Sequence, residues 1–249
     1  MNVLLTGAAR GLGLGICAQL AARGDTVFAA CRKRNAELDA IAERSTSKGG
    51  KGGKGGKVRV IESVDIAMDN AIAKLKAGIA GASLDAVICN AAVNASFDTD
   101  GVADLDLDIS LHEYQTNALG AVRTVQAALP SLSKGSKILF ITTGPQALGK
   151  KAPAPGVYGY RMSKGAMHTF ANLLTLELKP RGIAVQIVSP GSIDTKMLWA
   201  VWEAGRTPNP PKDALSIEEG AQRIIARMDE LTLEKTGTWV SNLGVPEPY

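Results

Sequence analysis

A tyrosine and a lysine, Tyr160 and Lys164, stand four residues apart in a segment whose pattern predicts a helix. At this spacing both side chains lie on one helix face. A tyrosine normally loses its proton at about pH 10, and a neighbouring ammonium favours the phenolate and lowers the pKa of Tyr160. Tyr160 is therefore a candidate acid or base at neutral pH, although such a pair also occurs as a plain surface contact.

Two threonine hydroxyls end the preceding predicted strand, which covers about 137–143. Because neighbouring residues of a strand point to opposite faces, only one of Thr142 and Thr143 can face Tyr160. We assign that place to Thr143, whose hydroxyl would hydrogen-bond a substrate oxygen and stabilise charge on it. The alternative is that both threonines stand here because β-branched residues favour strands.

A glycine-rich turn near the start of the chain offers a place for a phosphate. Gly7, Gly11 and Gly13 follow the apolar run 3–5 and open a predicted helix at about 11–23. Glycines permit a tight turn and a close approach to the backbone, and a helix N-terminus attracts anions. Such turns are also common as plain loop closures, but the strand before and the helix after favour a dinucleotide site.

Basic residues replace the acid that an NAD site would carry. The second predicted strand, at about 26–31, ends at Arg32, whereas an acidic residue at that place binds the ribose of NAD. Arg32 and Arg10, from the glycine turn, would both reach the extra phosphate of NADP. We therefore predict NADP (NADPH) in preference to NAD, with a solvated basic cluster as the alternative.

Strand and helix patterns alternate along the whole chain. This alternation predicts an α/β fold with a doubly wound parallel sheet of about seven strands, helices on both faces, and one domain over 1–249. Further strands are expected near 2–6, 58–61, 84–89, 183–188 and 237–241, and further helices near 35–46, 67–80, 110–129, 157–179 and 216–231. We expect segments 94–109 and 192–215 to be irregular. The candidate residues fall at the carboxyl edge of the sheet, where such folds bind ligands.

Composition excludes several other functions. The 249 residues carry a net charge of only +4, spread along the chain, which argues against nucleic-acid binding. Three cysteines and two histidines show no metal-ligand spacing, so we expect no metal and a reducing, cytoplasmic location. No segment is apolar enough to span a membrane. The Lys/Gly run at 48–57 lacks the features of a P-loop and is expected to be a mobile connector at the opposite edge.

Together these motifs resemble the short-chain dehydrogenase/reductase family over nearly the whole chain. The matching positions are Thr6, Gly7, Gly11 and Gly13, then Asp65, Asn117, the Tyr160–Lys164 pair, and Pro190, Gly191 and Thr195. Segment 157–164 and the ending at 237–248 resemble the C-factor/sniffer-type carbonyl reductases. Two positions depart from the family pattern: Ala92 stands in place of a glycine, and Thr143 in place of the catalytic serine.

The resemblance implies an NADPH-dependent oxidoreductase that reduces a ketone or aldehyde to an alcohol, or the reverse. Tyr160 would donate the proton, Lys164 would lower the pKa of Tyr160 and hold the ribose, Thr143 would orient the carbonyl, and Asn117 would support a water relay. The expected cofactor-binding residues are Gly7, Arg10, Gly11, Leu12, Gly13, Arg32, Asp65, Ile66, Asn90, Ala91, Tyr160, Lys164, Pro190, Gly191, Ile193 and Thr195.

The resemblance also implies a substrate lid at about 192–215, with Met197, Leu198, Trp199 and Trp202 as its apolar residues. The partners implied are a small carbonyl or alcohol substrate and further copies of the chain, in a homodimer or homotetramer paired through helices 110–129 and 157–179. Two alternatives remain: an epimerase or dehydratase on the same scaffold, and a non-catalytic NADP-binding sensor. Fold alone does not choose among them.

Overall fold

The computed structural model describes residues 1–47, 56–96, 101–144, 148, 156–205 and 212–248. Seven parallel strands form one sheet in the order β3-β2-β1-β4-β5-β6-β7. They are β1 (Asn2–Thr6), β2 (Thr26–Ala30), β3 (Lys57–Ile61), β4 (Leu84–Cys89), β5 (Leu132–Ile141), β6 (Ala184–Ser189) and β7 (Thr238–Ser241). The chain therefore has the predicted doubly wound parallel sheet in a single domain.

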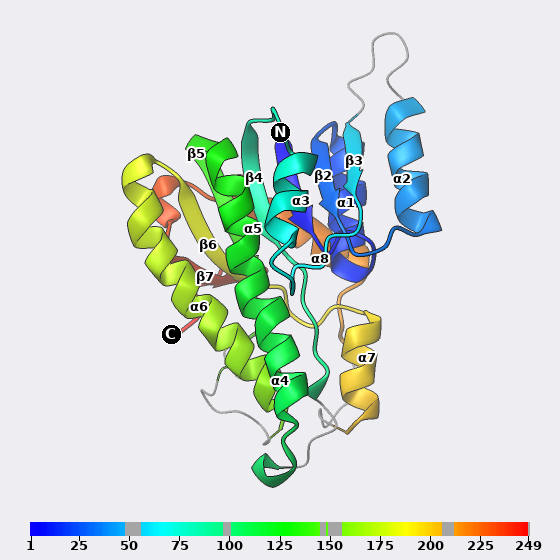
Figure 1. Cartoon of the computed structure of the whole chain (residues 1–249), viewed down its shortest axis with the longest axis vertical. Coiled ribbons are helices and arrows are strands. Elements are labelled where there is room, and N and C mark those ends of the chain that lie inside the picture. Colours follow the sequence, from blue (N-terminus) through cyan, green and yellow to red (C-terminus); the bar gives the residue numbers. More distant parts are fainter. Residues whose placement is uncertain (48–55, 97–100, 145–147, 149–155, 206–211, 249) are drawn as a thin grey trace.

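Helices cover both faces of this sheet (Figure 1). They are α1 (Gly11–Arg23), α2 (Ala36–Ser47), α3 (Ala71–Gly78), α4 (Leu107–Tyr114), α5 (Gly120–Ala128), α6 (Tyr158–Leu178), α7 (Lys196–Glu203) and α8 (Ile217–Glu230). One apolar core lies between the sheet and α3, α5 and α6. A second lies between the sheet and α1, α2 and α8. Because both faces are covered, the strands are apolar almost throughout.

The prediction of one continuous helix at 110–129 is wrong. It begins earlier, at Leu107, where Asp106 caps the first turn by accepting hydrogen bonds from two backbone N–H groups. A π-helical turn at Gln115–Leu119 then separates α4 from α5. This turn contains no proline that would mark an interruption, so the sequence pattern did not reveal it. π-helical turns occur frequently at functional sites.

Segment 192–215, expected to be irregular, contains helix α7 and a short parallel bridge between Ile193 and Leu215. Thr195 caps α7 by accepting a hydrogen bond from the Leu198 N–H. Residues 206–211 of the segment lie outside the described residues. The acidic segment 94–109 likewise contains a helical turn, Val102–Asp104, and the start of α4.

Three expectations about composition can be examined in the described residues. Cys17, Cys31 and Cys89 are free and buried, as predicted. The described residues contain no cluster that could hold a metal, and none of their helices is long and apolar enough to cross a membrane. Most of the Lys/Gly run lies outside the described residues, but Lys57, at its end, hydrogen-bonds Asp25 at the amino edge of the sheet.

Candidate active site

The glycine turn has the backbone that its sequence predicts. Gly7 and Gly11 adopt positive φ angles of 71° and 53°, which L side chains rarely adopt. Gly13 is required for packing instead: a Cβ on it would overlap the carbonyl oxygen of Gly7 and lie 2.6 Å from Nδ2 of Asn90. The turn and the start of α1 are therefore held in close contact, which only a glycine at position 13 permits.

Helix α1 begins at this turn without a side-chain cap. Arg10, at the N-cap position, makes no side-chain hydrogen bond to the first turn of the helix. The first backbone N–H groups of α1, including those of Leu12 and Gly13, thus remain at the positive end of the helix dipole. A phosphate is the anion that such a helix end binds well, so the turn fits the pyrophosphate of a dinucleotide.

A hydrogen-bonded junction ties the loop after β4 to the glycine turn. Asn90 donates from Nδ2 to the carbonyl oxygen of Thr6 at 3.0 Å, and the backbone N–H groups of Asn90 and Ala91 both donate to Oγ1 of Thr6 at 3.2 Å. The Cα of Ala91 lies 2.8 Å from the place where a Cβ on Gly7 would stand. The structure thus brings Asn90, Ala91 and Gly7 together at the carboxyl edge.

The side chains of Thr142 and Thr143 point to opposite sides, as the alternation of neighbouring residues requires. The side chain of Thr143 lies near enough to the Tyr160 hydroxyl to act on its pKa. Oγ1 of Thr142 lies 2.6 Å from Nε2 of His168, on the other side. Of the two threonines, Thr143 is therefore the one that can touch a substrate oxygen held by Tyr160.

Lys164 lies one helical turn beyond Tyr160 and is buried, with 3% of its surface exposed. Its Nζ donates a hydrogen bond to the carbonyl oxygen of Ile141 at 2.9 Å and lies 5.8 Å from the centre of the Tyr160 ring. Burial lowers the pKa of Lys164 to about 8. The end of β5 therefore fixes this amine beside the tyrosine.

The expected direction of the Tyr160 pKa is wrong for this arrangement. Burial raises the pKa of Tyr160 to about 12; the hydrogen bond with Thr143 acts to lower it, and the charge of Glu113 acts to raise it. The prediction from sequence took into account only the charge of Lys164, because the loss of solvent around the phenol depends on the folded structure. Tyr160 is consequently a protonated group at neutral pH, which suits a proton donor.

Asn117 lies in the π-helical turn and is almost fully buried. Its Oδ1 accepts from the backbone N–H of Val93 at 2.8 Å, and its Nδ2 donates to the Val93 carbonyl oxygen at 2.8 Å and to Oγ of Ser163 at 2.9 Å. These hydrogen bonds join Asn117 to the loop after β4 and to α6. The structure places it beside the helix that carries Tyr160 and Lys164, while its role in a water relay stays a prediction.

Arg10 and Arg32 are both exposed at the carboxyl edge. Their loops touch: Asn35 donates from Nδ2 to the carbonyl oxygen of Ala9 at 2.8 Å, and the Ala8 N–H donates to the Ala30 carbonyl oxygen at 3.2 Å. The next arginine, Arg34, is ion-paired with Asp39 at 2.6 Å. The touching loops therefore place Arg10 and Arg32 at the same side of the sheet edge, outside β2.

The side chains of Asp65 and Ile66, which follow β3, lie in different surroundings. Asp65 is half-buried at the edge, where its Oδ1 accepts the N–H of Ala67 at 3.1 Å. Ile66 is buried, and its side chain packs against Gly120 of α5. Only Asp65 therefore presents its side chain where an adenine could lie, and the side chain of Ile66 belongs to the core.

The segment after β6 returns to the glycine turn. Asn242 donates from Nδ2 to the carbonyl oxygen of Pro190 at 2.6 Å, and Gly191 has a φ of 78°. Ile193 is buried, and the methyl carbon of Thr195 lies 3.3 Å from the place of a Cβ on Gly11. The segment after β6 thus lies against the glycine turn at the same edge of the sheet.

This arrangement is shared with known proteins. The short chain dehydrogenase family model matches residues 1–205. The chain belongs to the short-chain dehydrogenase family. A 1-hydroxy-2-glutathionyl-2-methyl-3-butene dehydrogenase of Rhodococcus sp. (strain AD45) is 30% identical over 240 residues, covering 95% of this chain and 94% of the relative.

Two solved carbonyl reductases show the same fold as this short-chain dehydrogenase. The NADPH-bound enzyme from chicken fatty liver has a TM-score of 0.79 at 21% identity, covering 100% of this chain and 98% of that chain. Carbonyl reductase Sniffer of D. melanogaster has a TM-score of 0.79 at 21% identity, and the match covers 100% of this chain and 99% of that chain. The family predicted from the motifs is therefore confirmed, and the fold is the one that these two carbonyl reductases share.

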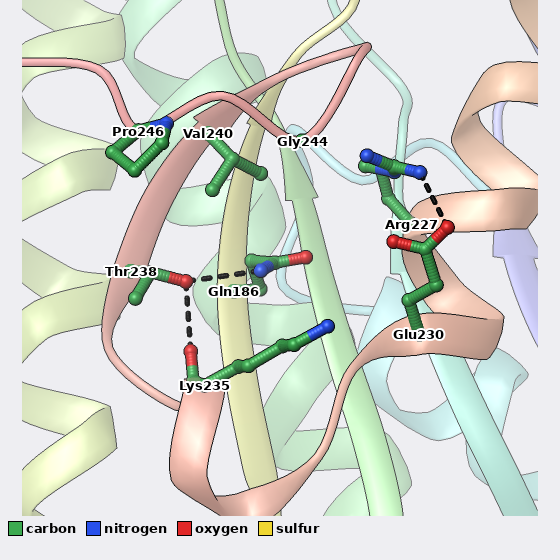
Figure 2. A pocket seen from close by; sticks show the side chains of 8 residues that line it. All are labelled: Gln186, Arg227, Glu230, Lys235, Thr238, Val240, Gly244 and Pro246. Carbon is green, nitrogen blue, oxygen red and sulfur yellow. Dashed lines mark hydrogen bonds and ion pairs between the residues drawn. The ribbon is translucent and has the colours of Figure 1, made fainter.

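Figure 2 shows a separate cavity of this short-chain dehydrogenase. It has a volume of about 210 Å³ and is lined by residues of β6, β7, the end of α8 and the segment leading to the C-terminus. Two buried atoms in its lining, Oε1 of Gln186 and Nε of Arg227, have no hydrogen-bond partner among the described residues. None of the predicted site residues lines it.

Proposed function

We propose that the protein is an NADPH-dependent carbonyl reductase whose proton donor is Tyr160. The observation that carries the proposal is the geometry around Tyr160: the amine of Lys164, hydrogen-bonded to the end of β5, lies 5.8 Å from the centre of its ring, and Thr143 lies beside its hydroxyl. The glycine turn and the α1 N-terminus supply a fitting seat for a dinucleotide. Both solved carbonyl reductases compared above share this fold.

In the proposed reaction, bound NADPH supplies the hydride that the carbonyl carbon requires. Tyr160 donates its hydroxyl proton to the carbonyl oxygen as the carbon–oxygen double bond becomes single. Thr143 hydrogen-bonds the same oxygen and stabilises the charge that develops on it. The ammonium of Lys164 stabilises the resulting phenolate until Tyr160 takes a proton back from solvent, and it also holds the ribose.

A turnover screen tests this proposal. Purified protein is assayed with a panel of aldehydes and ketones, with NADPH and NADH in parallel, by loss of nicotinamide absorbance and by analysis of products. Carbonyl-dependent oxidation of NADPH supports the reductase. Cofactor binding without turnover would indicate a sensor, and a changed product without net cofactor consumption would indicate an epimerase or dehydratase.

The preference for NADPH is proposed to rest on Arg32. In the variant Arg32→Asp, the dissociation constant for NADPH should rise by roughly 10–100-fold, because a charge-assisted contact with the 2′-phosphate is replaced by repulsion. The constant for NADH should change by less than about threefold, since NADH lacks that phosphate. Fluorescence titration with both cofactors measures the two constants.

The neighbouring exposed residue Lys33 provides the matched control for Arg32. Lys33→Asp changes the net charge by the same amount without removing the guanidinium at the end of β2. An equal loss of NADPH affinity in both variants would show that general charge, and not a specific phosphate contact, selects the cofactor.

Helix α7 is proposed as the lid over the substrate. None of its residues is buried, and the rings of Trp199 and Trp202 meet edge to face with their centres 5.5 Å apart. Asp194 accepts a hydrogen bond from the Trp199 indole at 2.6 Å and joins the helix to the segment beside the glycine turn. An apolar lid of this kind would exclude water from the reacting carbonyl.

A second copy of the chain is proposed to cover an apolar face of α4 and α6. Exposed large side chains recur at three- and four-residue spacing on these adjacent helices: Leu107, Leu111 and Tyr114 on α4, and Leu173 and Leu176 on α6. Side chains at this spacing form one stripe, and exposed apolar patches of this kind mark association surfaces.

The double variant Leu173→Glu/Leu176→Glu tests this interface. Unpaired carboxylates in an apolar interface are costly, so the variant should sediment as a monomer where the unmodified protein sediments as a dimer or tetramer. Met68→Glu, at an exposed apolar residue before α3, is the control and should leave the oligomer intact. An oligomer that survives the double variant would place the interface elsewhere.

A further inference from the structure

A buried acid, Glu113, lies on α4 one helical turn before Asn117. No part of its surface is exposed. Its Oε1 accepts two backbone hydrogen bonds, from Ala95 at 2.6 Å and from Ser96 at 3.0 Å. Glu113 and Asn117 thus hold consecutive parts of the loop after β4 against the helices.

The same loop is joined to the start of the helix that carries Tyr160. Ser96 is buried, and its Oγ accepts the backbone N–H of Tyr160 at 3.4 Å. A continuous series of contacts therefore runs from the carboxylate of Glu113 through Ser96 to the backbone of Tyr160.

The second carboxylate oxygen of Glu113 faces Gly159. Oε2 is buried and has no hydrogen-bond partner among the described residues. A Cβ on Gly159 would overlap it and would also lie 2.8 Å from both Cα and Oγ of Ser110. The glycine immediately before Tyr160 therefore makes the space in which this carboxylate lies.

The ionisable groups that act on Lys164, beside Tyr160, come from α6 and β4. Lys164 contributes the amine described above. Burial lowers the pKa of His168 to about 4 and raises the pKa of Cys89 to about 12, so both are neutral at pH 7. The charge of Glu113 raises the pKa of Tyr160 beyond the effect of burial. Glu113 is therefore the acid that opposes ionisation of the phenol.

We propose that Glu113 is a positioning residue that holds the loop after β4 against α6 and keeps Tyr160 as a proton donor, which favours reduction over alcohol oxidation. This proposal rests on the proposed function, because oxidation of an alcohol requires the phenolate of Tyr160 as the base. A negative charge in a site with little solvent disfavours that phenolate. The acid acts through Tyr160 and does not touch the substrate.

The variant Glu113→Gln tests the charge, because glutamine keeps the shape and an acceptor oxygen for Ala95 and Ser96. The rate of alcohol oxidation with NADP⁺ should begin to rise at lower pH than in the unmodified protein and should be at least about threefold higher at pH 8. Reduction at pH 7 should change by less than about twofold. Asp108→Asn, at an exposed acid of the same helix, should leave both profiles unchanged.

A variant that separates position from charge is Glu113→Asp, which keeps the carboxylate but shortens its reach to Ala95 and Ser96. It should raise the KM for the carbonyl without shifting the pH profile of oxidation. An oxidation profile of Glu113→Gln identical to that of the unmodified protein, in folded enzyme, would overturn the proposal.

A spectroscopic readout does not depend on turnover or on the folding of the glutamine variant. The phenolate absorbance of Tyr160, taken as the difference between unmodified protein and Tyr160→Phe, should stay absent up to pH 9. Ionisation of Tyr160 below pH 8 would overturn the proposal for Glu113. Turnover that survives in Tyr160→Phe would instead overturn the proposed function. The pH titration of the phenolate absorbance would then still test the proposal for Glu113.

Discussion

Replacement of Tyr160 by phenylalanine is expected to lower kcat by roughly 10²–10⁴-fold, the usual contribution of a positioned proton donor. The variant keeps the ring and the burial of the side chain but removes the hydroxyl that is paired with Thr143. Loss of one partly buried hydrogen bond costs about 1 kcal/mol of folding free energy. The protein should therefore remain folded and bind NADPH almost as well as before.

The measurement combines steady-state turnover, on the best carbonyl of the screen, with cofactor titration by fluorescence. Tyr158→Phe is the matched control, because it removes the same hydroxyl two residues away on the same helix, where Met162 stands in place of a cationic partner. Turnover should survive in Tyr158→Phe. Retained turnover in Tyr160→Phe would show that another group donates the proton.

The strands, the glycine turn and the order of the motifs were predictable because each depends on local sequence. Continuous apolar runs indicate strands covered on both faces, and a parallel sheet then places every strand end at one edge. Strand alternation indicates that only one of Thr142 and Thr143 faces Tyr160, and the family resemblance points to Thr143. These features need no knowledge of which side chains meet in three dimensions.

The remaining features depend on tertiary contacts. The π-helical turn around Asn117 and the burial that raises the pKa of Tyr160 both arise where α4 and α6 pack together. Glu113 resembles any helix acid in the sequence, although its place four residues before Asn117 puts both on one helix face. That spacing was the available signal, and it required the assumption that this face is buried.

The second large effect is expected at Gly13. In Gly13→Ala, the added methyl overlaps the carbonyl oxygen of Gly7 and lies 2.6 Å from Nδ2 of Asn90, so the glycine turn must move away from α1. Forcing extra atoms into a packed site costs about 1–3 kcal/mol, which exceeds the gain of roughly 1 kcal/mol from replacing glycine in a helix. The melting temperature should fall by several degrees, at about 2–4 °C per kcal/mol.

The effect on cofactor affinity should be larger than the effect on stability. The displaced turn carries the backbone N–H groups that face a pyrophosphate, and Asn90 links it to the loop after β4. We expect the dissociation constant for NADPH to rise at least about tenfold, because the helix end and the turn must converge on the same phosphates. Calorimetric titration and thermal unfolding of the same preparation measure the two effects.

Gly165→Ala provides the control, because Gly165 also lies in a helix but a Cβ on it would meet nothing within 4 Å. That variant should be neutral or stabilised by up to about 1 kcal/mol, with unchanged affinity for NADPH. If Gly13→Ala behaved like Gly165→Ala in both measurements, the contact between Gly13 and Gly7 would not hold the phosphate seat, and the cofactor would bind elsewhere at the sheet edge.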